Sequence, residues 1–192
     1  MEIFSSYFYE EEIKEFINTS TPTDKYNLQL YKAEENAGWV NFYFKYNEDE
    51  FKIFITLAAY DLRELIFFLE NIIDLKDETV IFLENEEIST PLLYVCPIDK
   101  EKIRFLVADE QRICDLFESD QIDKDDLKGI FDYDIRCDVI IEKKNLLKQF
   151  YRGIKNIINN CKVYDGHVYD IEYLAWKDNL KNIISYLKKE EI

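Results

Sequence analysis

The residues in this chain that are best suited to chemistry are carboxylates at short spacing. Asp132 and Asp134 stand two positions apart, so on a strand both side chains would point to one face and could share a divalent metal ion. The same spacing is typical of a solvated strand face, whose charge discourages aggregation between sheet edges. We favour this second interpretation, because two carboxylates alone are a weak signal for metal binding. A small metal-dependent hydrolase that uses this pair and a nearby glutamate is the alternative.

The other candidate residues match no reaction motif. Asp123, Asp125 and Asp126 resemble the start of a calcium-binding loop, but residues 123–134 have no glycine at the sixth position and no glutamate at the twelfth. His167 is the single histidine, and any catalytic triad would need it, yet it falls in a predicted surface turn. The sequence contains no nucleophile elbow, phosphate-binding loop or zinc-protease motif. We therefore predict no catalytic residue, no metal site and no cofactor.

The acidic residues are unevenly distributed along the chain. The formal net charge is −16. Residues 77–141 hold 18 acidic against 7 basic residues, whereas residues 142–192 hold 7 acidic against 10 basic ones. Such an acidic surface repels phosphate groups, so we predict no nucleic-acid ligand. A basic protein is the partner that this charge attracts, and nuclease toxins are often basic because they bind nucleic acid.

The most acidic stretch also contains aromatic residues. Residues 109–138 hold 11 acidic and 4 basic residues, with Phe117, Phe131 and Tyr133 among them. Apolar anchors inside a charged rim are typical of protein-binding surfaces. Alternatively, the aromatic residues face the core and the acidic ones only keep the protein soluble, because both arrangements produce the same alternation. The candidate partner-binding residues are Asp115, Phe117, Glu118, Asp120, Asp123, Asp125, Asp126, Phe131, Asp132 and Asp134.

Hydrophobic periodicity indicates the elements that must position these residues. Helical spacing predicts helices over residues 6–18, about 60–75, 146–158 and 174–187. Strand-like runs cover residues 26–30, 40–44, 51–57, 79–83, 92–96, 103–107, 112–117 and 132–141. The short polar connector 46–50 predicts an antiparallel hairpin, and Pro91 and Pro97 are expected to bracket the strand between them. The basic residues expected on the solvent face of the helix after residue 142 are Lys143, Lys144, Lys148, Arg152 and Lys155.

The alternation over residues 132–141 is the clearest strand pattern in the chain. It predicts a buried face with Tyr133, Ile135, Cys137, Val139 and Ile141, and an exposed face with Asp132, Asp134, Arg136 and Asp138. Together the elements predict an α+β fold, with a mainly antiparallel β-sheet, a central helix at about 60–75 packed on it and two C-terminal helices. We expect a single domain over 1–192, with an N-terminal helix in 1–20, a sheet-rich body in 25–141 and a C-terminal helical pair in 142–192.

Targeting features are also expected to be absent. The first residues have neither the basic nor the apolar region of a secretory signal, and the longest apolar run, Leu65 to Leu69, is too short for a membrane span. The four cysteines form no CxxC pair and are expected to be reduced and mostly buried. We therefore predict a cytoplasmic protein that does not contact a membrane; no oligomeric state is predicted.

The order of these elements resembles a known family. Strands ending at Phe51–Leu57 precede the pattern Asp61-Leu62-x-x-Leu65-x-x-x-Leu69, further strands follow, and Leu146-Leu147-x-x-Phe150 begins the closing helix. Over roughly residues 26–160 this order resembles small immunity proteins of bacterial polymorphic toxin systems, especially those partnered to wall-associated toxins. The chain differs in having Asn85 after Glu84, where that family often has proline, and in its second terminal helix.

The resemblance implies a cytoplasmic, non-catalytic inhibitor that binds one cognate toxin domain. Such an inhibitor would be an acidic binding protein that neutralises a basic toxin domain by covering its active site. A non-catalytic regulatory or scaffold subunit is a further alternative.

Overall fold

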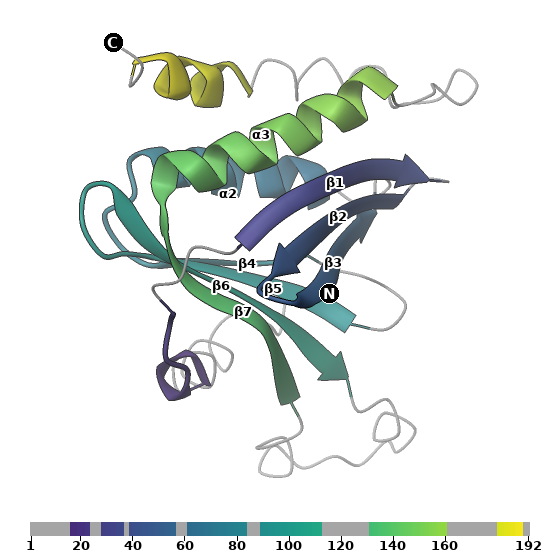
Figure 1. Cartoon of the computed structure of the whole chain (residues 1–192), viewed down its shortest axis with the longest axis vertical. Helices are drawn as coiled ribbons and strands as arrows, with labels where there is room; N and C mark the ends of the chain where they lie inside the picture. Colours follow the sequence, from purple (N-terminus) through teal and green to yellow (C-terminus); the bar gives the residue numbers. More distant parts are fainter. Residues whose placement is uncertain are drawn as a thin grey trace, which may run out of the picture.

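The structure is a computed structural model, and it describes residues 16–23, 28–36, 39–56, 61–83, 89–112, 131–160 and 180–189. It contains two antiparallel sheets with helices packed against them, which confirms the predicted α+β class (Figure 1). The labelled elements are β1 (Leu28–Asn36), β2 (Trp39–Tyr46), β3 (Asp49–Thr56), α2 (Asp61–Ile73), β4 (Thr79–Phe82), β5 (Ser89–Pro97), β6 (Lys102–Arg112), β7 (Phe131–Glu142) and α3 (Lys143–Asn160). Residues 16–19 and 180–189 are also helical.

The first sheet has the strand order β1-β2-β3. The predicted hairpin between β2 and β3 is confirmed, since Tyr46 pairs with Asp49 across a two-residue turn. Asn47 in this turn has a φ of 57°, a left-handed conformation that asparagine tolerates better than most residues. The alternating residues Val40, Phe42 and Phe44 of β2 are fully buried, so the period of two predicted the buried face correctly.

The second sheet has the order β4-β5-β6-β7, with each strand antiparallel to the next. Pro97 ends β5 as expected, but Pro91 does not mark its beginning, because the strand begins at Ser89. The pairing of β4 with β5 ends at Phe82 and Leu92, so the missing N–H of Pro91 falls beyond that ladder. Its carbonyl still accepts a hydrogen bond of 2.9 Å from the N–H of Leu83. The part of the predicted 112–117 strand after Arg112 lies outside the described residues.

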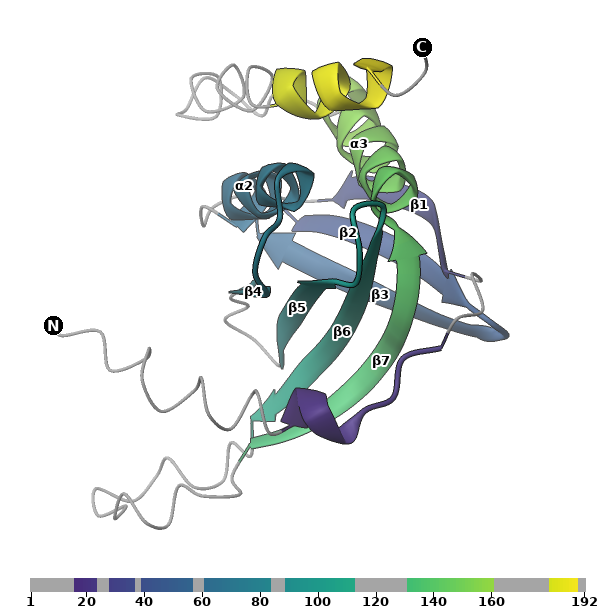
Figure 2. The same cartoon turned by 90° about the vertical axis from the view of Figure 1, so that its left-hand side faces the viewer.

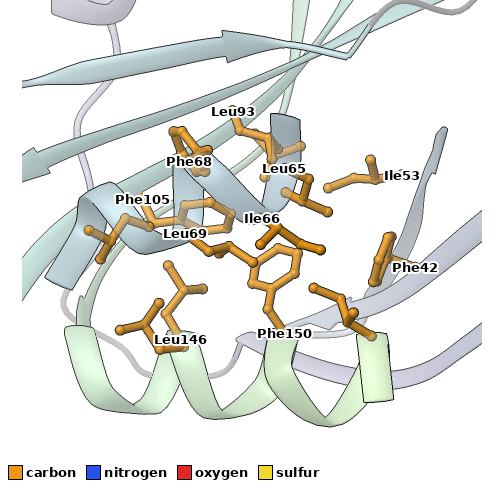
Figure 3. Packing of buried hydrophobic residues seen from close by; sticks show 14 of the residues in the cluster. Phe42, Ile53, Leu65, Ile66, Phe68, Leu69, Leu93, Phe105, Leu146 and Phe150 are labelled. Carbon is orange, nitrogen blue, oxygen red and sulfur yellow. The ribbon is translucent and has the colours of Figure 1, made fainter. Parts of the chain in front are cut away.

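One hydrophobic cluster joins both sheets to the helices. Phe150 of α3 lies at its centre, with ring centroids 5.8 Å from Phe42, 5.7 Å from Phe44 and 6.2 Å from Phe105 (Figure 3). Because Phe42 and Phe44 belong to the first sheet and Phe105 to the second, this side chain links the two. The predicted apolar stripe of α2 is buried in the same cluster, through Leu62, Leu65, Ile66, Leu69 and Ile72. The helix over residues 180–189 adds Leu180 and Ile183 from the far side of α3 (Figures 1 and 2).

The helix α3 packs closely along β1 and covers its open edge. A Cβ atom on Gly153 would lie 3.0 Å from Leu30 Cδ2 and 3.1 Å from Ala33 Cβ, so glycine permits the close approach. Gln149 accepts a hydrogen bond of 2.6 Å from the N–H of Leu30 and donates to the carbonyl of Leu28. Asn156 donates to the carbonyl of Ala33. Side-chain amides thus bind backbone groups that an edge strand otherwise leaves unpaired.

Two expectations about exposed faces are wrong. Lys143 was expected on the solvent face of its helix but is buried, with its ammonium donating to the carbonyl of Ile73 at 3.3 Å. The outer face of the second sheet was expected to be wet, yet the short helix at residues 16–19 lies against it (Figure 2). A second cluster on that face contains Ile17, Leu92, Tyr94, Leu106 and Ala108.

Candidate functional site

The ladder between β6 and β7 places acidic residues from both ends of the 109–138 stretch on adjacent strands. Asp109 pairs directly with Asp134, and the next two pairs are Glu110 with Tyr133 and Gln111 with Asp132. These pairs lie at the beginning of β7, remote from its junction with α3 (Figure 1). Directly opposed residues share a face of a sheet, so the fold brings Asp109 and Asp134 together although they are 25 positions apart in the sequence.

A β-bulge in β7 changes which face these residues occupy. Val107 pairs with Cys137, but Ala108 pairs with Ile135, so Arg136 is an extra residue in β7. A one-residue offset moves every following side chain to the opposite face. Asp134 therefore lies on the face of Val107 and Asp109, whereas Asp138 pairs with Leu106 on the other face. The prediction that Asp134, Arg136 and Asp138 share one exposed face is wrong for this reason.

Arg136 joins the two opposed carboxylates. Its Nε donates to Asp109 Oδ2 at 2.6 Å and its Nη1 lies 2.8 Å from Asp134 Oδ2. The side chain of Asp109 is 14% exposed, whereas those of Arg136 and Asp134 are 38% and 48% exposed. The hydrogen bond to Asp109 is the main cause that raises the pKa of Arg136. Asp109, Arg136 and Asp134 together carry one net negative charge. The more accessible of the two carboxylates is that of Asp134.

This arrangement suits binding of a cation on a partner better than metal chemistry. A divalent metal ion usually takes several oxygen ligands, whereas a lysine or arginine side chain can pair with a single exposed carboxylate. In the part of the chain that the structure describes, no three His, Cys, Asp or Glu residues are grouped so that they could hold a metal ion. The exposed carboxylate and its fixed neighbours can instead bind a lysine or arginine side chain.

Only part of the predicted site falls within the described structure. Asp134 is exposed, as predicted. Phe131 and Asp132 occupy the first two positions of β7, opposite Arg112 and Gln111. The remaining candidates lie outside the described residues: Asp115, Phe117, Glu118, Asp120, Asp123, Asp125, Asp126 and His167. Sequence reasoning missed Asp109. This aspartate lies two residues after the buried Val107, at a position where the strand alternation predicts an apolar residue, and that mismatch was the available signal.

Asp138 takes part in a buried ion pair instead of the exposed surface. Its side chain is 5% exposed and that of Arg104 is 13% exposed. Arg104 binds it through two hydrogen bonds, Nε to Oδ1 at 2.9 Å and Nη2 to Oδ2 at 2.7 Å. The hydroxyl of Ser20 donates to Oδ2 at 2.5 Å. The hydrogen bonds between Arg104 and Asp138 are the main cause that raises the pKa of Arg104. Together with the bond from Ser20 they satisfy a charge that would otherwise be costly to bury.

The same pair attaches residues 16–23, which we call the N-terminal strap, to the second sheet. Arg104 Nη2 also donates to the carbonyls of Ile17 at 2.9 Å and Ser20 at 3.1 Å. Thr23 forms a parallel bridge to Val139, with hydrogen bonds of 3.0 and 3.1 Å to the backbones on either side. The strap covers this face of the sheet and shields Asp138 from water. We therefore assign the hydrogen bonds among Arg104, Asp138 and the strap a role in stability.

Comparison with known proteins adds no family to this description: no protein-family model matches the chain, and neither does any curated protein or solved structure. Among the residues described here, none of the helices has the length and apolar character that crossing a membrane requires.

Proposed function

We propose that this chain is an acidic protein-binding module whose partner is a basic protein domain. The observation that supports it best is the register of β6 and β7, which sets Asp109 beside Asp134 and leaves the Asp134 carboxylate exposed. Seven of the ten candidate contact residues lie in the segment that connects these two strands. Residues 113–130, which we call the acidic segment, therefore leave β6 and enter β7 within a few residues of this carboxylate pair.

More specifically, we propose an immunity protein that acts in the cytoplasm and covers the active site of a basic toxin domain. Such a domain carries cationic residues where it binds its own anionic substrate. The acidic segment would accelerate the encounter by electrostatic steering, and apolar side chains such as Phe117 would add affinity after contact. Because surface charges are screened beyond about 8 Å at physiological ionic strength, the association rate should fall as salt is added.

The direct test is rescue of growth. A toxin domain encoded beside this chain in the genome is expressed from an inducible promoter, with and without this chain in the same cells. We expect growth only when both proteins are present, and a calorimetric titration of the purified pair should show a one-to-one complex. Replacing Asp123, Asp125 and Asp126 by asparagine should reduce the association rate and weaken the rescue.

A matched pair of charge reversals localises the interface. Asp134→Lys changes the exposed carboxylate at the β6–β7 end, while Asp77→Lys makes the same charge change in the exposed turn after α2. We expect the first variant to slow association by about tenfold and the second to have a much smaller effect. Equal effects of the two variants would contradict the proposed interface, and a neutral or acidic partner that binds independently of salt would refute the proposal as a whole.

A further inference from the structure

The two helical segments at the C-terminal end have a composition opposite to that of the rest of the chain. The helix α3 contains five lysine or arginine residues and no aspartate or glutamate. Residues 180–189 contain three lysines and again no acidic residue. The two segments together hold 28 residues, 18 in α3 and 10 in 180–189, and none of them is acidic in a protein with 40 acidic residues. Such a composition is unexpected for a surface that only needs to be soluble.

These segments line an open groove of about 210 Å³. Its cationic lining consists of Lys144, Lys148, Arg152 and Lys188, and its apolar lining of Tyr151, Ile184 and Leu187. Figure 2 shows the 180–189 helix alongside α3, on the side away from the strands. Figure 1 shows these two helical segments at the opposite end of the molecule from the beginning of β7, the strand end that carries the carboxylate pair.

The four cations of the groove differ in exposure and lie close to one another around the same apolar residues. Among the residues that the structure describes, none of them forms an ion pair with a carboxylate. Lys144 and Lys148 are half-buried, and Arg152 and Lys188 are exposed. Cations gathered around one groove repel one another, and an anionic partner would relieve that repulsion.

We propose that this groove binds an acidic segment of a partner protein, with one apolar side chain inserted between Tyr151, Ile184 and Leu187. The volume is below the roughly 300–1,000 Å³ of sites that enclose a whole small molecule, and it suits a single anchoring side chain. Carboxylates on either side of that anchor would pair with Lys148 and Lys188. The inference does not rest on the proposed function, because it concerns a different surface and a partner of opposite charge.

The apolar floor favours a peptide over other polyanions. Nucleic-acid backbones and lipid headgroups present phosphates, whose recognition depends on polar donors and gains little from aliphatic side chains such as Ile184 and Leu187. A second copy of this chain would bring a further net charge of −16, and the repulsion between two such molecules opposes association. An acidic peptide with apolar residues between its carboxylates matches both parts of the lining.

The test measures fluorescence anisotropy of a labelled peptide in which glutamate and leucine alternate, titrated with the full chain. A peptide of equal charge in which glutamate and serine alternate measures the contribution of the anchor. The variant Lys148→Glu with Lys188→Glu reverses two groove charges, and Lys76→Glu with Lys189→Glu makes the same change at exposed positions outside the groove. Urea unfolding of each variant verifies that it is folded, and Lys148→Gln with Lys188→Gln serves if the reversal unfolds the chain.

We expect saturable binding of the glutamate–leucine peptide and at least about tenfold weaker binding of the glutamate–serine peptide. The groove variant should weaken binding at least about tenfold, with a much smaller effect of the control variant. No saturable binding, or equal losses in both variants, would overturn the proposal. Tighter binding of oligothymidine or of vesicles containing phosphatidylserine, lost in the groove variant, would also overturn it and assign the groove to those ligands.

Discussion

Replacing Asp138 by asparagine tests whether the N-terminal strap depends on the buried ion pair. The substitution keeps the shape of the side chain but removes the charge that Arg104 neutralises through bonds of 2.9 and 2.7 Å. The guanidinium then stays buried among Ile17, Ser20 and Tyr94 without a counter-charge. Asparagine can still accept one hydrogen bond from Arg104, but its amide group opposes the second.

The expected loss follows from the burial of the two partners. Breaking a buried ion pair by removing one partner costs about 3–5 kcal/mol. Since the side chain of Arg104 is 13% exposed and can recover some hydration, we expect the lower end, about 3 kcal/mol. For a chain of 192 residues this corresponds to a decrease in Tm of about 6–12 °C. With a urea m-value of about 2 kcal/mol/M, the unfolding midpoint should fall by about 1.5 M.

Urea unfolding measures the total loss, and amide hydrogen exchange shows where it occurs. The N–H groups of Thr23 and Ile140 bond across the junction between the strap and β7, so both should lose protection in Asp138→Asn. The N–H of Leu30, which bonds to Gln149 on the other side of the molecule, is the internal reference. Its protection should fall only with the global stability.

A double substitution separates the ion pair from simple packing. Arg104→Met combined with Asp138→Leu replaces both charges by apolar groups, which is often neutral or stabilising. We expect it to recover most of the stability lost in Asp138→Asn. A loss below about 1 kcal/mol in Asp138→Asn, as at a surface ion pair, would refute the reasoning. A double variant as unstable as the sum of its two single variants would refute it as well.

Three further predictions follow from other parts of the structure. Gln149→Leu leaves the N–H of Leu30 and the carbonyl of Leu28 without their side-chain partner, so urea unfolding should show a loss of about 1–3 kcal/mol. Burial raises the pKa of the Cys137 thiol, so iodoacetamide should modify Cys137 only after unfolding. The partly buried Cys96 should react in the native protein. Peptide mass spectrometry measures the modification of each cysteine. Two backbone N–H groups donate to Asp99 and lower its pKa below that of a free aspartate. Its stabilising contribution is therefore present above the unfolded pKa, about 4, and is lost as the pH falls through the folded value, which NMR titration should show.

The elements whose pattern is local could be predicted from the sequence. The apolar residues of α2 recur at helical spacing and are buried, because one side of a helix faces the core whatever surrounds it. The hairpin of β2 and β3 followed from a short polar connector between alternating strands, because short connections favour antiparallel neighbours. The distribution of charge, and the acidic segment with it, is likewise a property of the sequence alone.

The faces on which the acidic residues lie were decided only by the tertiary structure. The extra residue at Arg136 reverses the parity of β7 between Asp134 and Asp138, and nothing in the alternation of the sequence marks it. Asp138 is dry because a strap more than a hundred residues earlier crosses its face. The basic groove exists because residues 180–189 lie beside α3. Sequence periodicity specifies which residues of an element lie together, but burial depends on which distant segment covers them, and that requires the packed fold.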